Sequence, residues 1–245
     1  MSTIPSVNSR PYPAVSLVAP VRSGDCDTNW LLARLPECVA EVILVCPSSA
    51  EASDRSTAPD GPRVRWMRQR DSGEGDIPHA GLLSASEDFI ALMGADGSMS
   101  PQEIPHYLHY LLNGYDFVKG SRFIAGGSCA DYPLLRRLGH HTLLHLARRL
   151  YGQQLTDLWY GFCAFRRDFL RLLDLRDDTV ELGAELVTHA MHYGLRIAEV
   201  PSRELPRRHA RSHPRTFHDG ARILGTLLDE RPHNLLPRLA PIPQR

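Results

Sequence analysis

Asp96 is a residue whose type and position could support chemistry. It follows FIALM, residues 89–93, an apolar run typical of a buried strand. An acid at a strand end is a common place for a metal, because parallel α/β sheets bind ligands at the carboxyl ends of their strands. Metal and phosphate chemistry often uses two acids spaced D-x-D, yet position 94 is glycine. Asp96 is therefore either a metal ligand or an acid of the turn before SPQEIP, where Asp and Ser are favoured.

Two segments concentrate arginine. LLRRLGHHTLLHLARRLYG, residues 134–152, has a helical pattern with four Arg, three His and no acid. Such a helix either lays its arginines on anionic lipid headgroups, as a peripheral membrane contact, or packs its Leu face in the core and exposes its Arg. Residues 203–222 carry six Arg against Glu204 and Asp219.

The elements that must position these residues alternate along the chain. Continuous apolar strands separated by helices indicate a mostly parallel sheet covered on both faces. The expected strands are 14–19, 41–46, 63–67, 88–93, 116–120 and 196–201. The expected helices are 27–35, 77–86, 101–114, 134–152, 168–175 and 180–194, and the Gly-rich segment 122–133 is expected to be a loop. We expect one domain over residues 14–231, an irregular tail at 1–13 and a Pro-rich tail at 232–245.

Composition narrows the class of protein. The chain has 245 residues, and its 28 Lys and Arg balance 28 Asp and Glu, so there is no global signature of nucleic-acid binding. The five cysteines contain no C-x-x-C pair, which favours free thiols in a reducing cytoplasm. No stretch approaches about 18 apolar residues, and the first residues lack the apolar core of a signal peptide. These features predict a cytoplasmic protein without a transmembrane segment.

Four motifs in order carry a family resemblance. They are GADGSMSPQEIP, DFVKGSRFIAGG, TDLWYGFCAFRRDFL and GAELVTHAMHYGLRIAEVPSRELPRR. Together they resemble glycosyltransferase family 2, in its dolichyl-phosphate-mannose-synthase-like branch, over roughly residues 14 to 228. The resemblance implies a GT-A fold, a Rossmann-type α/β fold of nucleotide-diphospho-sugar transferases with a mixed, mostly parallel sheet. It also implies a nucleotide-sugar donor, Mg²⁺ or Mn²⁺, and inversion at the anomeric carbon.

The resemblance also assigns roles to single residues. Asp96 matches the acid of D-x-D that contacts the metal, and Arg122 could reach a phosphate or a neighbouring acid. Asp157 matches the acceptor-side motif and is the first candidate for contacting the acceptor, or else it caps its loop. Glu185 matches the acid of an A-E-L helix, as a base or acceptor contact, or else it is an exposed helix residue.

The resemblance also implies a basic loop that binds the donor diphosphate. Arg207, Arg208 and Ser212 match it. Arginine suits this role because its planar guanidinium can bind phosphate through two hydrogen bonds. The alternative is a solvated basic loop without a ligand.

Four departures from the family pattern fall in the nucleotide-binding half. The first strand ends APVRSGDCD in place of P-x-x-N-E, and the second ends VCPSSAEAS in place of D-D-G-S. DSGEGD puts Glu74 between two glycines, where the family often has a basic residue, and D-x-D has become Gly94-Ala95-Asp96. The acceptor half keeps its motifs.

Two functions of different class follow from this contrast. The first is a glycosyltransferase that moves a sugar from a nucleotide donor to a hydroxyl or phosphate acceptor, either a polyprenyl phosphate or a small secondary metabolite. The alternative is a catalytically silent module with the same fold that binds a partner protein or a ligand.

Overall fold

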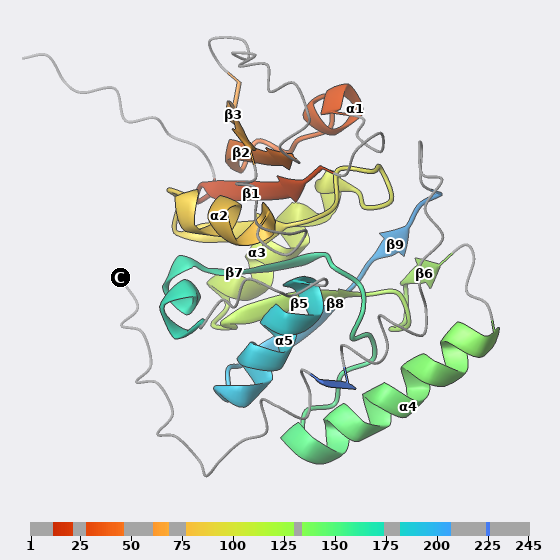
Figure 1. Ribbon diagram of the computed structural model, residues 1–245. Helices are drawn as coiled ribbons and strands as arrows, with labels where there is room; N and C mark the ends of the chain where they lie inside the picture. The colour runs from red at the N-terminus through yellow and green to blue at the C-terminus, as the bar shows by residue number, and fades with distance from the viewer. Residues whose placement is uncertain are drawn as a thin grey trace, which may run out of the picture.

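A mixed β-sheet forms the centre of the molecule in a computed structural model (Figure 1). The structure describes residues 12–21, 28–46, 61–68, 77–129, 134–173, 182–206 and 224–225. Within them, a seven-stranded sheet has the order β3-β2-β1-β4-β7-β5-β8. Its strands are β1 (Val15–Pro20), β2 (Val39–Cys46), β3 (Arg63–Arg68), β4 (Phe89–Leu92), β5 (Phe117–Ser121), β7 (Cys163–Arg166) and β8 (Ile197–Pro201).

Parallel pairing dominates the sheet. β1 pairs in parallel with β2 and β4, β2 with β3, and β5 with β8. In this sheet only β7 is antiparallel to its neighbours, which are β4 and β5. The six predicted strands and the mixed, mostly parallel sheet are confirmed. β7 was not predicted, because its antiparallel place between β4 and β5 is set by long-range pairing.

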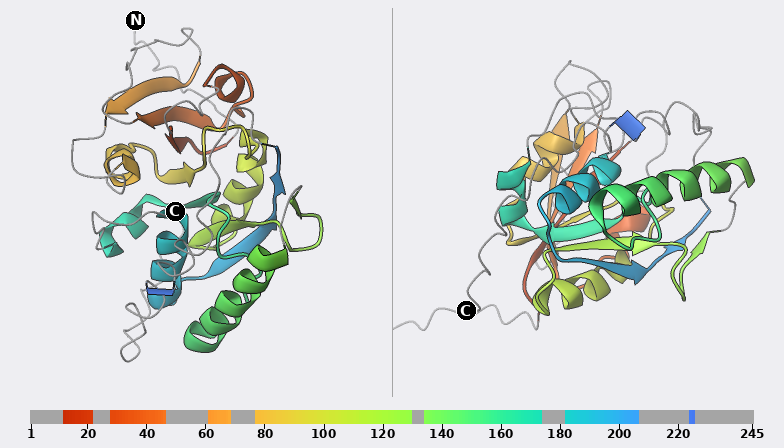
Figure 2. Two further views of the ribbon diagram at one scale, coloured as in Figure 1. Left: turned by 45° about the vertical axis from the view of Figure 1, so that its right-hand side comes forward. Right: turned by 90° about the horizontal axis from the view of Figure 1, so that it is seen from below.

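Helices cover both faces of the sheet. They are α1 (Thr28–Leu32), α2 (Ile77–Ser84), η1 (Pro101–Glu103), α3 (Ile104–Leu112), α4 (Leu134–Tyr151), η2 (Arg167–Leu172) and α5 (Leu182–His192). Neighbouring strand residues point to opposite faces: Leu17 packs in the core cluster of α1 and α3, and Val18 in that of α2, α4 and α5. The view from below in Figure 2 shows this division, with α3 on one side of the sheet and α2, α4 and α5 on the other.

Two predictions of local structure need correction. The α-helix predicted at 168–175 is a 3-10 helix in its described part, η2, which ends at Leu172. The predicted loop 122–133 contains a two-residue strand, β6 (Ser128–Cys129), which pairs in parallel with β9 (Arg203–Glu204). The pairing of β6 with β9 joins segments far apart in sequence, which local propensity does not encode. The predicted tails lie outside the described residues except for residues 12 and 13, so they stay predictions.

A buried carboxylate joins the strands at the amino edge of the sheet. Glu41 of β2 is fully buried and accepts hydrogen bonds from Ser16 Oγ at 2.7 Å, Ser86 N at 2.9 Å and Arg63 at 3.0 Å. A nitrogen of Arg65 lies 2.7 Å from the same carboxylate. Burial alone would raise the pKa of Glu41, but the hydrogen bonds from Ser16 and Ser86 and the charge of Arg65 lower it below its ordinary value. This network fixes β1, β2 and β3 at the edge opposite to the carboxyl ends.

Candidate active site at the carboxyl edge of the sheet

Loops from four strands meet at the carboxyl edge of the sheet. Because β7 is antiparallel, its first residue lies there: Cys163 pairs with Leu92 on β4 and with Lys119 on β5. The loop before β7 therefore lies beside the loops that follow β4 and β5. The segments that meet are 93–100, 122–127, 156–162 and 202–206.

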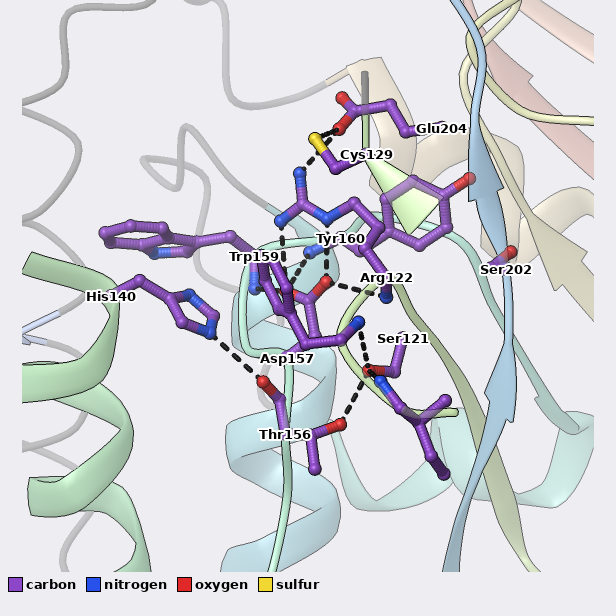
Figure 3. A network of polar contacts seen from close by, with 12 residues as sticks. Ser121, Arg122, Cys129, His140, Thr156, Asp157, Trp159, Tyr160, Ser202 and Glu204 are labelled. Carbon is purple, nitrogen blue, oxygen red and sulfur yellow. Dashed lines mark hydrogen bonds and ion pairs between the residues drawn. The ribbon is translucent and has the colours of Figure 1, made fainter. Parts of the chain in front are cut away.

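Arg122 and Asp157 form a buried ion pair in this edge. Arg122 Nε donates to Asp157 Oδ2 at 2.7 Å, and a terminal nitrogen of Arg122 donates to Asp157 Oδ1 at 3.1 Å. The side chain of Asp157 is 0% exposed and that of Arg122 is 2% exposed. Arg122 thus contacts a neighbouring acid, one of the two contacts predicted for it, and its contact with a phosphate stays a prediction. Figure 3 shows the guanidinium between Asp157 and Glu204, beside the ring of Tyr160.

The pair keeps both groups ionised in spite of burial. Burial alone would raise the pKa of Asp157, but hydrogen bonds from Arg122 and its charge outweigh this and lower it. Burial alone would lower the pKa of Arg122, but Asp157 and Glu204 raise it further above its ordinary value. A buried charge of this kind is stable only while its partner is present.

Asp157 also caps its own loop. Asp157 Oδ1 accepts hydrogen bonds from the backbone N–H groups of Trp159 at 3.1 Å and Tyr160 at 3.2 Å, and Oδ2 accepts from Arg122 N at 3.2 Å. The loop-cap alternative is thus confirmed. The carboxylate has no exposed surface for an acceptor in this structure, so the acceptor contact stays a prediction.

Glu204 extends the network to β9. A terminal nitrogen of Arg122 donates to Glu204 Oε2 at 2.8 Å, and Cys129 Sγ lies 2.7 Å from the same oxygen. Ser202, just before β9, is held by Glu103 and shares a hydrogen bond of 3.2 Å with Tyr107. Arg122 therefore ties the start of the basic segment 203–222 to the acceptor-side loop.

Asp96 lies in a turn of the same edge. Asp96 Oδ1 accepts from Ser98 N at 3.0 Å and from Ser98 Oγ at 2.5 Å, and its side chain is half-buried. This contact is the turn role expected as an alternative. A Cβ atom added at Gly94 would lie 3.4 Å from Asp96 Oδ1. A side chain at position 94 would therefore begin close to this carboxylate.

The chain after β9 passes the Asp96 turn. Leu205 N donates to Ser98 O at 2.8 Å, two residues beyond Asp96. Arg207, Arg208 and Ser212, predicted to hold a diphosphate, lie outside the described residues, so their role stays a prediction. Three of the four departures from the family pattern, at 22–27, 47–53 and 71–76, also lie outside the described residues.

Glu185 occupies a separate buried position on α5. Its side chain is 4% exposed, which excludes the alternative of an exposed helix residue. His79 Nε2 of α2 lies 3.5 Å from one carboxylate oxygen, and His189 Nε2 lies 3.7 Å from the other. A Cβ atom added at Gly183 would lie 2.8 Å from Gly161 Cα, so α5 begins against the loop that Asp157 caps.

Several polar residues of the edge were not predicted. Glu199 of β8 accepts hydrogen bonds from the backbone N–H groups of Thr156 and Asp157 at 2.8 to 3.0 Å. Burial raises the pKa of Glu199 above its ordinary value, although the hydrogen bonds from Thr156 act against this. Lys119, fully buried, donates to Tyr160 O. Lys119 and Glu199 could have been identified from the sequence, because each is a charged residue within an apolar strand.

These observations define a nucleotide-sugar transferase scaffold of the GT-A type. Residues 32–173 match the model of glycosyl transferase family 2. Undecaprenyl-phosphate mannosyltransferase of Micrococcus luteus is 30% identical over 184 residues, which cover 69% of this chain and 74% of the relative. The chain belongs to glycosyltransferase family 2, and the resemblance seen in the sequence is confirmed.

Two further comparisons refine the branch and the fold. Polyprenol monophosphomannose synthase of Mycolicibacterium smegmatis is 30% identical over 156 residues, 61% of this chain and 59% of the relative. Glucosyl-3-phosphoglycerate synthase of Mycobacterium tuberculosis, solved with Mn²⁺, UDP and glucosyl-3-phosphoglycerate, has a TM-score of 0.67 at 18% identity. That superposition covers 89% of this chain and 80% of the synthase and confirms the GT-A fold.

Proposed function

We propose that the protein transfers a sugar from a nucleotide-sugar donor to a polyprenyl phosphate. One observation carries this proposal: the similarity to undecaprenyl-phosphate mannosyltransferase, at 30% identity, covers more than two thirds of both chains. Dolichyl-phosphate hexose transferase of Haloferax volcanii, at 29% identity over 168 residues, supports the same acceptor class. The acceptor-side loop keeps its family motif, and hydrogen bonds between Arg122 and Asp157 hold this loop in place.

The burial of Asp157 and Glu185 favours a phosphate acceptor over a hydroxyl. A hydroxyl needs a general base within hydrogen-bond reach to remove its proton. Glu185, predicted as a base or acceptor contact, and Asp157, predicted as an acceptor contact, are both buried and both engaged by basic side chains. A phosphate monoester is already ionised at neutral pH, so it can attack without a base. We assign Asp157 a positioning role for Arg122 within this proposal.

Asp96 is the residue proposed to hold a divalent cation. Among the described residues no group of three or more His, Cys, Asp or Glu is arranged as a metal cage. Proteins often hold Mg²⁺ through one or two carboxylates together with substrate phosphates. The half-buried Asp96 carboxylate at the carboxyl edge fits such a site. A bound metal would neutralise charge on the leaving nucleoside diphosphate.

Arg207, Arg208 and Ser212 are proposed to bind the donor diphosphate. Support comes from the hydrogen bond between Leu205 N and Ser98 O, because it brings the chain to the Asp96 turn two residues before Arg207. Guanidinium groups bind phosphate in bidentate fashion, and such contacts weaken as salt rises. We expect Arg208→Ala to weaken nucleotide binding by about tenfold or more, in line with about 1.5–3 kcal/mol for a hydrogen bond to a charged group.

A binding experiment tests the donor site. Thermal unfolding would be followed with UDP-, GDP- and dTDP-sugars, each with and without Mn²⁺. A ligand that binds the folded state raises the midpoint according to its affinity and concentration. We expect one donor to stabilise the protein with Mn²⁺, and Asp96→Ala to remove that effect. Asp168→Ala, which changes an exposed acid of η2, is the matched control. Metal-dependent stabilisation that survives in Asp96→Ala contradicts the metal role of Asp96.

A further inference from the structure

We infer that the exposed face of α4 is a docking surface for an anionic lipid bilayer. Arg137, His141, His145 and Arg149 follow one another at intervals of four residues, and all four are exposed. Residues four apart lie on the same side of a helix, so these side chains form one basic ridge. From Arg137 to Arg149 the ridge is about 18 Å long.

The row of α4 residues next to the ridge packs on the candidate site. His140 is buried, and its Nε2 lies 3.1 Å from Thr156 O. Arg148 donates to Leu155 O at 2.7 and 2.9 Å. The orientation of α4 is therefore fixed by the loop that carries Asp157, and its basic ridge must face outward. Figure 2 shows α4 at the margin of the molecule, with one end projecting past the sheet.

Charge complementarity identifies an anionic surface as the partner. Residues 134–152 contain no acid, although the whole chain has as many acids as Lys and Arg. The positive charge is thus concentrated locally on a chain with no net charge. A basic helix face of this kind suits anionic headgroups, where each Lys or Arg near the surface strengthens binding by about fivefold.

Exposed apolar side chains beside the ridge favour a bilayer over a soluble polyanion. Leu138 is 67% exposed and Phe123 is 40% exposed. The Phe123 ring lies 4.9 Å from the ring of His140, so Phe123 flanks α4. Large apolar groups next to a basic surface can enter the headgroup region, whereas RNA or heparin offers them no apolar phase.

This surface continues into the candidate site. Phe123 directly follows Arg122, whose guanidinium joins Asp157 and Glu204. Docking through α4 and Phe123 would present the carboxyl edge of the sheet to the headgroup layer, where the phosphate of a polyprenyl lipid lies. The role in acceptor delivery rests on the proposed function, but contact with the bilayer does not.

Vesicle sedimentation with the full chain tests the inference. We expect binding to phosphatidylcholine vesicles that contain about one third phosphatidylglycerol, little binding to pure phosphatidylcholine, and a decrease as salt rises. Arg137→Ala with Arg149→Ala should weaken binding by about 25-fold, from about fivefold for each charge. The control is Arg167→Ala with Arg171→Ala, which removes two charges of η2 whose side chains are 47% and 84% exposed.

A second pair of variants tests the apolar contribution. Leu138→Ala should weaken binding to the anionic vesicles, whereas Leu83→Ala, at a 66% exposed position of α2, should leave it unchanged. Absence of vesicle binding, or equal loss in the η2 control, overturns the inference. Binding to poly(U) RNA that depends on Arg137 and Arg149, without vesicle binding, overturns it in favour of nucleic acid.

One further measurement separates this inference from the proposed function. Transfer to a short-chain, water-soluble polyprenyl phosphate needs no bilayer. If the wild type and the Arg137→Ala, Arg149→Ala variant both carry out this transfer but neither binds vesicles, the proposed function holds and the docking surface is refuted. If both fail in transfer while the wild type alone binds vesicles, the docking surface holds and the proposed function is refuted.

Discussion

At the scale of single residues, the carboxyl edge depends on the contact between Arg122 and Asp157. Both side chains are almost fully buried, and their mutual hydrogen bonds compensate the loss of hydration. Three backbone N–H groups add to the stabilisation of Asp157. The pair joins segments 35 residues apart in sequence and orders the loop before β7.

Replacing Asp157 should therefore destabilise the whole protein. Asp157→Asn keeps the shape of the side chain but leaves the Arg122 charge buried without its main partner. We expect the free energy of unfolding to fall by about 3–5 kcal/mol, measured by urea denaturation at neutral pH. Asp168→Asn, which removes the exposed partner of Arg171, should change it by less than about 0.5 kcal/mol. Equal effects of the two substitutions would show that the buried pair is not needed for stability.

Gly94→Asp should create the missing acid pair. A Cβ atom at position 94 would lie 3.4 Å from Asp96 Oδ1, so the new carboxylate would lie close to the existing one. Two adjacent acids repel each other without a cation and bind a divalent cation more tightly than one. We expect a lower unfolding midpoint than wild type without metal and a larger increase on addition of Mn²⁺. The uncharged Gly94→Asn variant should show neither effect, and a Mn²⁺ response equal to that of Asn would contradict the prediction.

Part of the site could be predicted from single residues. Asp96 and Arg122 follow apolar strands, and the rule that strand ends meet at one edge predicts their location. The burial of Asp157 could not be predicted, because it depends on β7 running antiparallel beside β5. The contact of Arg122 with Glu204 likewise depends on the pairing of β6 with β9, which are only two residues long.

At the scale of elements, α5 and the acceptor-side loop meet through two glycines. Gly183→Ala would place a Cβ atom 2.8 Å from Gly161 Cα, which is too close without movement of the backbone. We expect a loss of about 1–3 kcal/mol in unfolding free energy. Gly139→Ala in α4 meets no atom within 4 Å and should instead stabilise the protein by about 0.5–1 kcal/mol. A stabilising effect of Gly183→Ala, measured beside Gly139→Ala by urea denaturation, would contradict the close approach.

The strands at the amino edge should lose stability in acid through Glu41. The pKa of Glu41 is lowered in the folded protein, so its contribution is complete above the unfolded value, about 4.3, and is lost as pH falls through the folded value. Glu41→Gln should lower the unfolding free energy by about 1.5–3 kcal/mol at pH 7. The difference from wild type should shrink below about pH 4. A difference that stays constant between neutral and acidic pH would contradict this role.

Elements with a marked apolar pattern were predictable, and elements set by long-range pairing were not. The six predicted strands and the helix at 134–152 rely on runs with clear periodicity, which the structure reproduces as β1 to β5, β8 and α4. In contrast, β7 spans only Cys163–Arg166, and its place between β4 and β5 is set by long-range pairing. The 3-10 helix η2 follows β7 directly, and its first residue, Arg167, donates its backbone N–H to Asp88 O at 2.9 Å.

At the scale of the whole molecule, the described residues form the frame of a family 2 glycosyltransferase. The sheet order and the GT-A fold agree with the family, and the acceptor half is fixed by buried polar contacts. Of the four departures from the family pattern, the one at Gly94 lies within the described residues. A Cβ atom added there would lie 3.4 Å from Asp96 Oδ1. Among the described residues, no helix is long and apolar enough to cross a membrane. If α4 docks as inferred, a polyprenyl acceptor would be met at the bilayer surface.

Transfer of labelled sugar to polyprenyl phosphate tests the central claim most directly. The full chain would be incubated with UDP-, GDP- and dTDP-linked sugars, polyprenyl phosphate and Mg²⁺ or Mn²⁺, and the label would be measured in the organic phase. We predict label in the lipid with one donor, none when the metal is removed, and none with Asp96→Ala. Absence of transfer with every donor, together with tight binding of polyprenyl phosphate in the absence of any nucleotide, would contradict the claim and identify a silent binding module.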